Sequence, residues 1–330
     1  MRIVETPEVD VGAQPVIAAI GTFDGVHLGH MQLFETALDI KAATGLPVMA
    51  AGFHPHPKSL VKSGNDYEAL LTPLEEKQAL LEDMGLDYFW AIPFTREVSQ
   101  LSPREFTHIY LRNKIRAEHI VCGFNFAFGY KRQGNPQVLR KLGQEMGFEV
   151  SVVPPYTIDG EVVSSTKVRQ LLSQGDAERA AALLGRPYCI YGPATKGQDI
   201  YMETGIPAWQ VLFPADKFLP KNGVYAVWAR ASKQLYPAVV SLGTSLEVHI
   251  PIFARDLQTV SLQGEGMQLF FMKHIKGERR FESRVHREKQ MKTDLEAALA
   301  VLKPHGTDYH DRGLFTPIGA YDRIFSADIP

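Results

Sequence analysis

Cysteine is scarce in this chain, with only two among 330 residues. Cys122 and Cys189 lie far apart and in no spacing typical of metal ligands, so we expect buried thiols in a reducing compartment, the cytoplasm. A disulfide-stapled secreted fold is thereby excluded. No apolar run approaches the length of a membrane span, and the first residues do not have the pattern of a signal peptide, so we expect no membrane partner.

An excess of basic residues is also absent, because 35 Lys and Arg against 37 Asp and Glu leave a net charge of −2. A protein that binds nucleic acid needs clustered basic residues, which neutralise the phosphates and release their counterions. Because this chain has no basic excess, we expect no nucleic-acid partner. Small anionic ligands held by a local site fit this balance. The chain also lacks internal repeats, and its length predicts two domains, each with its own core. Nothing in it indicates an oligomeric state.

The first half of the chain has the pattern of an α/β domain. Up to about residue 155, short apolar runs alternate with helical periodicity, which predicts a parallel sheet. Thr72 and Glu75 predict a capping box, with Pro73 at the first helical position. Ligands of such sheets bind beyond the carboxyl ends of the strands. The predicted strands are 16–20, 47–53, 88–92, 119–122 and 149–153.

The second half has a different pattern. Two short helices are predicted at 165–175 and 176–185, with Asp176 as an N-cap. Alternating segments then predict a small antiparallel barrel, closed by a helix at 282–302. The residues from 304 on show no periodicity. The predicted barrel strands are 223–230, 237–242, 246–253 and 267–274. The predicted domains are 1–185, 186–303 and an irregular tail, 304–330.

Residues 21–30, GTFDGVHLGH, stand where the first buried strand turns into a helix. Backbone N–H groups and the helix dipole attract phosphate at such a turn, and glycine lets the backbone bend tightly. His27 and His30 can donate hydrogen bonds where a leaving phosphate develops charge. The alternative is a pair of solvated loop histidines beside a simple turn. The surrounding strand and helix favour a nucleotide site for phosphoryl chemistry.

This block resembles the GxFDGxHxGH signature of nucleotidyltransferases, and within them the adenylyltransferase half of bacterial FAD synthetases. The resemblance implies a Rossmann-like domain in which His27 and His30 act on the departing pyrophosphate of ATP. It also implies that Mg²⁺ bridges the phosphates, with Asp24 as the nearest acidic candidate and the metal ligands otherwise unknown. The positions implied to bind the nucleotide here are Gly21, Phe23, Asp24 and Gly29.

Two further stretches match the same family in order. Residues 53–57, FHPHP, resemble its FxPHP loop, which implies that His56 faces the flavin phosphate; a rigid turn with surface histidines is the alternative. Residues 123–129, GFNFAFG, resemble its GxNFxFG block. That match implies that Asn125 orients nucleotide or flavin and that Phe126 and Phe128 offer flat surfaces to a ring, although such phenylalanines also pack in cores.

Residues 164–169, SSTKVR, resemble the SSTxxR motif, which implies a grip on the ATP phosphates by Ser164, Ser165, Thr166 and Arg169. The planar fork of an arginine suits two phosphate oxygens. A plain N-cap would explain one hydroxyl, but not three with an arginine at this spacing. Residues 183–188, LLGRPY, resemble the junction between the two domains of the family.

The second domain of that family is a riboflavin kinase barrel. Its G-[FY]-P-T-A-N motif holds Mg²⁺ and phosphates, and a downstream glutamate is the base. Here Ala208 and Gln210 replace the threonine and the asparagine, while Glu247 matches the glutamate. The side chain of alanine has no oxygen for a metal. The flap arginines are replaced by Ile200 and Met202. We therefore expect a riboflavin kinase fold whose chemistry is lost or redirected.

The sequence thus predicts an FMN adenylyltransferase that forms FAD and pyrophosphate from ATP and FMN. One alternative is a fully bifunctional enzyme that also uses riboflavin. A second is a flavin- or nucleotide-binding regulatory protein derived from this family. A third keeps nucleotidyl transfer but uses another acceptor.

Overall fold

The computed structural model describes residues 1–4, 11, 14–57, 69–196, 208–231, 234–243, 246–249, 266–277 and 284–302. They belong to two compact units, the first Met1–Ser164 and the second from Ser165 onward. The predicted domain boundary at 185 stays a prediction. The flap at 197–207, residues 250–253 of a predicted strand and the tail from 304 lie outside the described residues.

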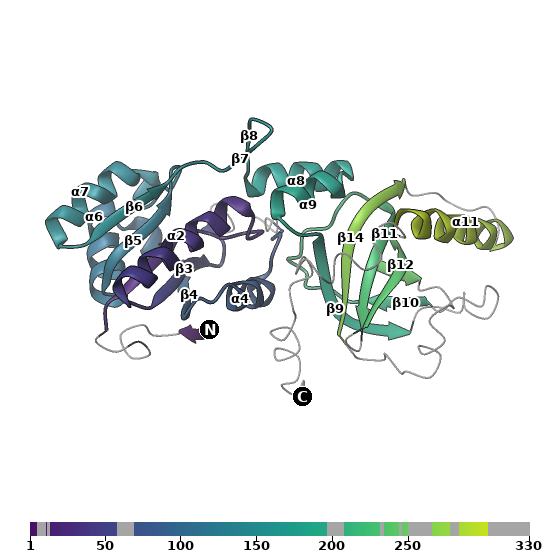
Figure 1. Cartoon of the computed structure of the whole chain (residues 1–330), viewed down its shortest axis with the longest axis horizontal. Coiled ribbons are helices and arrows are strands. Elements are labelled where there is room, and N and C mark those ends of the chain that lie inside the picture. The colour runs from purple at the N-terminus through teal and green to yellow at the C-terminus, as the bar shows by residue number, and fades with distance from the viewer. Residues whose placement is uncertain are drawn as a thin grey trace. The chain divides into compact units, whose positions relative to one another are not determined.

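A parallel sheet forms the centre of the first unit (Figure 1). In the described residues its order is β1-β4-β3-β2-β5-β6, and every pairing is parallel. The chain moves outward from β2 in one direction through β3 and β4, and in the other through β5 and β6. The switch point of the sheet therefore lies between β2 and β5. The strands are β1 (Arg2–Val4), β2 (Val16–Ile20), β3 (Val48–His54), β4 (Tyr88–Pro93), β5 (Ala117–Gly123) and β6 (Glu149–Val153).

Burial on both faces explains the apolar runs. All five residues of β2 are buried, and alternate residues belong to two separate hydrophobic clusters, one on each side of the sheet. The five predicted strands are confirmed to within a few residues. The edge strand β1 was not predicted, because three residues are too few to show a pattern.

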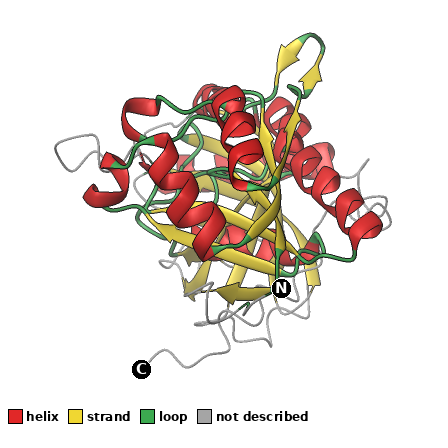
Figure 2. Ribbon diagram, turned by 90° about the vertical axis from the view of Figure 1, so that its left-hand side faces the viewer, coloured by secondary structure: helices red, strands yellow, loops and turns green. Residues whose placement is uncertain are grey.

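Helices flank this sheet (Figure 2). Asn135 caps α7, and Ser102 with Glu105 forms a capping box on α6. A hairpin, β7 (Thr157–Ile158) and β8 (Glu161–Val162), follows the sheet. The helices are α2 (Leu28–Thr44), α4 (Leu74–Asp83), α5 (Arg96–Gln100), α6 (Pro103–Phe106), η1 (Thr107–Lys114), η2 (Tyr130–Arg132) and α7 (Pro136–Met146).

The predicted capping box of α4 is wrong. The N-cap position is held by Pro73, and no side chain caps this helix. The Thr72 hydroxyl instead accepts a hydrogen bond from the backbone N–H of Gly25, at 2.8 Å. A partner distant in sequence has replaced the local one, which the spacing Thr-x-x-Glu cannot reveal.

The second unit begins with two short helices, α8 (Ser165–Gln174) and α9 (Ala177–Leu184). Asp176 accepts from Arg179 N and caps α9, as predicted. A closed antiparallel barrel follows, with the order β10-β13-β12-β11-β14-β9 among the described strands, and α11 (Arg284–Leu302) packs on it. The predicted barrel and closing helix are confirmed; β9 and β10 were not predicted. The strands are β9 (Tyr188–Lys196), β10 (Ala208–Val211), β11 (Gly223–Ala231), β12 (Gln234–Leu242), β13 (Leu246–His249) and β14 (Gly266–Lys276).

Candidate functional site

The turn between β2 and α2 carries the two predicted histidines. His27 is the N-cap residue of α2, with extended backbone, and its carbonyl accepts from the N–H groups of His30 and Met31 at 2.7 and 3.0 Å. The first N–H groups of the helix have no partner within it. Together with the helix dipole, they make this turn favourable for a phosphate group.

The rings of His27 and His30 are stacked. Their centroids are 3.6 Å apart and their planes differ by 17°. Phe23 meets His30 edge-on, with ring centroids 5.5 Å apart. His27 is buried, and a Cβ on Gly29 would lie 3.3 Å from Cε1 and Nδ1 of the His27 ring. Gly29 therefore leaves room for the imidazole, and the turn holds two ring N–H donors side by side.

The remaining residues stabilise the turn by packing and by a hydrogen bond. Phe23 is fully buried and lies against Phe34. A Cβ on Gly21 would come within 2.7 Å of the Phe23 ring, so only glycine fits there. Asp24 is 1% exposed and accepts a hydrogen bond from Thr72 N at 3.2 Å. The carboxylate is thus engaged in bracing the turn.

The loop after β5 lies beside this turn at the same edge of the sheet. Ile20 and Cys122 are register partners in β2 and β5, so the loops that follow them emerge together at the switch point. Asn125 in that loop is exposed. A Cβ on Gly123 would lie 3.4 Å from Asn125 Oδ1. The fold therefore brings the predicted asparagine to the edge where the histidines stand.

The phenylalanines of this loop differ in exposure. Phe128 is 4% exposed and packs against Phe106 and Phe126, and a flavin contact there would require its ring to leave this packing. Phe126 is half-buried. Phe124, which the sequence analysis did not single out, is 44% exposed. Its position directly after the strand is the signal that distinguishes it from the two rings behind it.

His56 lies in the loop after β3, the other neighbour of β2, and is partly exposed. Because β3 is parallel to β2, this loop leaves the sheet at the same edge as the histidine turn. Apart from Ser164, which ends the unit, the sequence-predicted residues of the first unit thus come from three adjacent strand ends.

The SSTxxR motif begins α8. Ser165 and Thr166 are in its first turn, and Ser164 precedes it. Val168, Leu171 and Leu172 are buried, whereas Arg169 is partly exposed. The Arg169 guanidinium lies over the ring of Phe218, 5.8 Å from its centroid. Ser165 to Arg169 belong to the second unit, and Ser164 ends the first.

The kinase-related positions meet in the barrel. β10 pairs with β13, so that Gln210 and Glu247 are register partners, as are Ala208 and His249. Thr195 on β9 donates its hydroxyl to the carbonyl of Gln210 at 3.4 Å. The topology therefore places Gln210 and Glu247 on neighbouring strands of the barrel.

Within the described ranges, no group of three or more His, Cys, Asp and Glu residues is arranged to hold a metal ion. The bracing contact of Asp24 with Thr72 agrees with this. Among the helices that the structure describes, none is long and apolar enough to span a membrane.

Comparisons with known proteins match the two halves of the chain to two different families. Residues 11–167 match the FAD synthetase family, and residues 184–302 match the riboflavin kinase family. A solved structure described as a macrolide-efflux protein from Streptococcus pneumoniae has 25% identity and a TM-score of 0.80. It covers 90% of this chain, and this chain covers 98% of it.

Three curated relatives carry the description bifunctional riboflavin kinase/FMN adenylyltransferase. The protein of Listeria monocytogenes is 32% identical over 77% of this chain and 83% of its own length. The protein of Escherichia coli K12 is 32% identical over 81% of this chain and 86% of its own length. The protein of Bacillus subtilis is 29% identical over 86% of this chain and 91% of its own length. With both family matches in this order, the chain belongs to the bifunctional riboflavin kinase/FMN adenylyltransferase family.

Proposed function

We propose that this protein transfers AMP from ATP to FMN, forming FAD and releasing pyrophosphate. The observation that carries the proposal is the stacked pair of His27 and His30 at the N-terminus of α2, beside the sheet's switch point. The FAD synthetase match over residues 11–167 supports the choice of substrates.

In the proposed reaction, an oxygen of the FMN phosphate attacks the α-phosphorus of ATP. A new phosphorus–oxygen bond forms as the bond from the α-phosphorus to the bridging oxygen breaks, and that oxygen leaves with pyrophosphate. The imidazole N–H groups and the N–H groups of α2 stabilise this departing charge. The protein thus acts by positioning and electrostatics, without a covalent intermediate.

Other predicted residues have supporting roles in the proposal. Asn125 orients nucleotide or flavin, and His56 faces the flavin phosphate. Gly21, Phe23, Asp24 and Gly29 shape the turn. Ser164, Ser165, Thr166 and Arg169 bind the triphosphate, which suits the hydroxyls and the guanidinium at a helix start. Phe126, together with the exposed Phe124, offers ring surface to the substrates.

Mg²⁺ enters the proposal as part of the substrate, MgATP. The described carboxylates do not fit a dedicated protein site for the ion, since they form no cluster and Asp24 is buried against Thr72. No step of the reaction is assigned to an ion held by the protein. A cytoplasmic location remains a prediction from the cysteine content.

We further propose that the barrel phosphorylates riboflavin weakly or not at all. Ala208 supplies no metal ligand, and Gln210 is one methylene longer than the family's asparagine. Bifunctional activity is the alternative, favoured by the riboflavin kinase match and by the Gln210–Glu247 pairing. A regulatory, flavin-binding barrel is the second alternative, which the closed barrel fold favours.

Product analysis separates these proposals. The full-length protein is incubated with ATP and Mg²⁺, once with FMN and once with riboflavin, and the flavins are separated chromatographically. We expect FAD from FMN and at most a trace of FMN from riboflavin. Strong FMN formation that is lost in Glu247→Gln would establish the bifunctional alternative. Riboflavin binding without product would indicate a regulatory barrel, and no FAD from FMN would contradict the main proposal.

A further inference from the structure

A buried lysine lies behind the turn that carries the two histidines. Lys77, in the first turns of α4, is 6% exposed, and its Nζ donates to the carbonyl of Thr22 at 2.9 Å. Burying an amino group is unfavourable unless it is well paired. A lysine at this place therefore indicates a task that an apolar side chain could not perform.

Three hydrogen bonds connect the start of α4 to this turn. Besides the Lys77 contact, Gly25 N donates to Thr72 Oγ1 at 2.8 Å, and Thr72 N donates to Asp24 Oδ1 at 3.2 Å. Thr72 and Asp24 are both buried, so water does not compete for these contacts. Lys77 and Thr72 thus hold the turn at residues 22, 24 and 25.

The backbone between these contacts has an unusual conformation. Phe23, Gly25 and Val26 have φ angles of 50°, 85° and 41°. Positive φ is unfavourable for phenylalanine and, above all, for the β-branched valine. Such conformations persist where the surrounding structure over-determines them, and they concentrate at functional sites. The hydrogen bonds of Thr72 and Lys77 hold the backbone in this conformation.

The conformation of the turn determines where the two histidines lie. Phe23 lies within it and contacts the His30 ring, while His27 ends it. Asp24 is also an electrostatic neighbour of Lys77, because burial lowers the pKa of Lys77 and the Asp24 carboxylate opposes that decrease. Removal of the lysine would therefore loosen the turn and leave the buried carboxylate without this neighbour.

We infer that Lys77 and Thr72 are positioning residues for adenylyl transfer. They fix the strained turn so that His27 and His30 stand where the leaving pyrophosphate develops charge. The inference rests on the proposed function, and it assigns neither side chain a contact with substrate. It assigns to α4 a part in the reaction that the histidine motif alone does not show.

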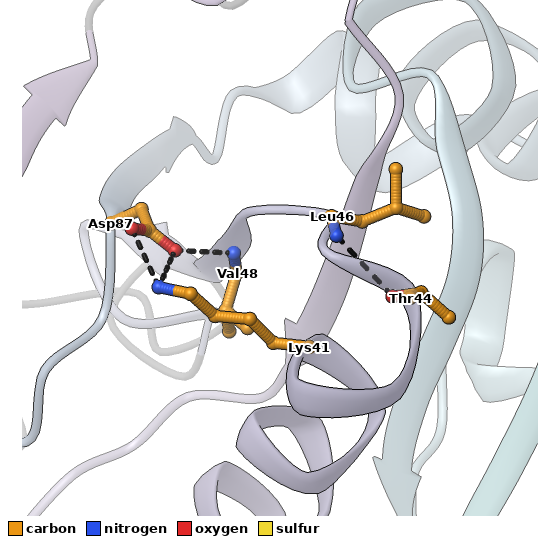
Figure 3. A network of polar contacts seen from close by, with 5 residues as sticks. All are labelled: Lys41, Thr44, Leu46, Val48 and Asp87. Atoms are coloured by element: carbon orange, nitrogen blue, oxygen red, sulfur yellow. Dashed lines mark hydrogen bonds and ion pairs between the residues drawn. The ribbon is translucent and has the colours of Figure 1, made fainter.

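The test compares two lysines of the same unit. Lys77→Met removes the hydrogen bond to Thr22. The control, Lys41→Met, removes a lysine whose Nζ lies 2.7 Å from both Asp87 carboxylate oxygens, next to Val48 at the amino end of β3 (Figure 3). We expect Lys77→Met to lower kcat for FAD formation about tenfold or more, with KM for FMN within about threefold. Lys41→Met is expected to leave kcat unchanged.

A second pair of variants covers the case in which Lys77→Met does not fold. Thr72→Val removes the acceptor of the Gly25 N–H at nearly constant volume, and Thr72→Ser retains it. We expect Thr72→Val to lower kcat and Thr72→Ser to restore it. A folded Lys77→Met or Thr72→Val protein with kcat within about twofold of the parent would overturn the inference.

An activity-independent readout separates this inference from the proposed function. The Cε1–H resonances of His27 and His30, assigned by single replacements in histidine-labelled protein, report the ring stacking. We expect them to shift in Lys77→Met and to stay in place in Lys41→Met. Absence of FAD formation by the parent would contradict the proposed function. Unchanged resonances in folded Lys77→Met would contradict the positioning role.

Discussion

The imidazole of His27 lies nearly parallel to that of His30, with 3.6 Å between the ring centroids and 17° between the planes. The two residues are three apart, the spacing that places side chains on the same side of a starting helix. Phe23 supports His30 from its edge. The pair is therefore held in place without a substrate, which would reduce the reorganisation needed in the proposed reaction.

Replacement of His30 tests the role of this pair. His30→Ala removes one donor for the departing pyrophosphate, a loss typically worth about 3 kcal/mol, or about a hundredfold in rate. We expect kcat for FAD formation to fall by that order while the circular dichroism spectrum is retained. His108→Ala is the control, since His108 is exposed on η1. A parental rate in His30→Ala would show that this imidazole has no part in the reaction.

A side chain at position 29 should lower the activity by moving the His27 ring. The added methyl group of Gly29→Ala would lie 3.3 Å from the His27 ring and displace it by a few tenths of an ångström. We expect kcat to fall about tenfold with little change in the melting temperature. Gly277→Ala, where the Cβ would meet nothing within 4 Å, provides the matched control. Equal kcat values for Gly29→Ala and the parent would show that the His27 ring position does not limit the rate.

Arg169 is expected to bind ATP through its planar fork. Arg169→Lys retains the charge but loses the bidentate geometry and the guanidinium contact over the Phe218 ring. We therefore expect KM for ATP to rise in a titration of FAD formation. Arg179→Lys changes an exposed arginine of α9 in the same unit and should leave KM unchanged. Identical ATP titrations for Arg169→Lys and the parent would place Arg169 outside the site.

Cys122 should make stability decrease at alkaline pH. Burial raises the pKa of its thiol from 9.0 to about 11, with Arg140 opposing the increase. Between these values the folded state binds more protons than the unfolded state, so stability falls as the pH rises. We expect Cys122→Val to weaken the decline in melting temperature between about pH 9 and pH 11. Parallel pH profiles of the variant and the parent would contradict this assignment.

The local sequence predicted much of the backbone structure around the candidate site. The strand–turn–helix around residues 21–30 follows from an apolar run, two glycines and helical periodicity, all of which act within a few residues. The start of α8 and the Asp176 cap follow in the same way. The capping box predicted at Thr72 was wrong for a clear physical reason. The spacing of Thr72 from Glu75 favours a cap, but its hydroxyl binds Gly25, 47 residues away.

Exposure of the phenylalanines also depended on distant neighbours. Phe128 pairs across a bridge with Gly134 and packs on Phe106, whereas Phe124 follows the strand end and stays open to solvent. The repeated Phe-x-Phe pattern contains no information about which ring the rest of the fold will cover.

By itself, the sequence determined the strand-to-helix turn, the spacing of the two histidines and the arginine-bearing helix start, because backbone preferences and helical spacing are local. Only the tertiary structure decided that β5 lies beside β2, which brings Asn125 to the histidines' edge, and that Lys77 is buried against Thr22. Strand order and burial arise from packing between segments far apart in the chain. The partner of a buried polar group is therefore set by the whole fold and not by its neighbours in sequence.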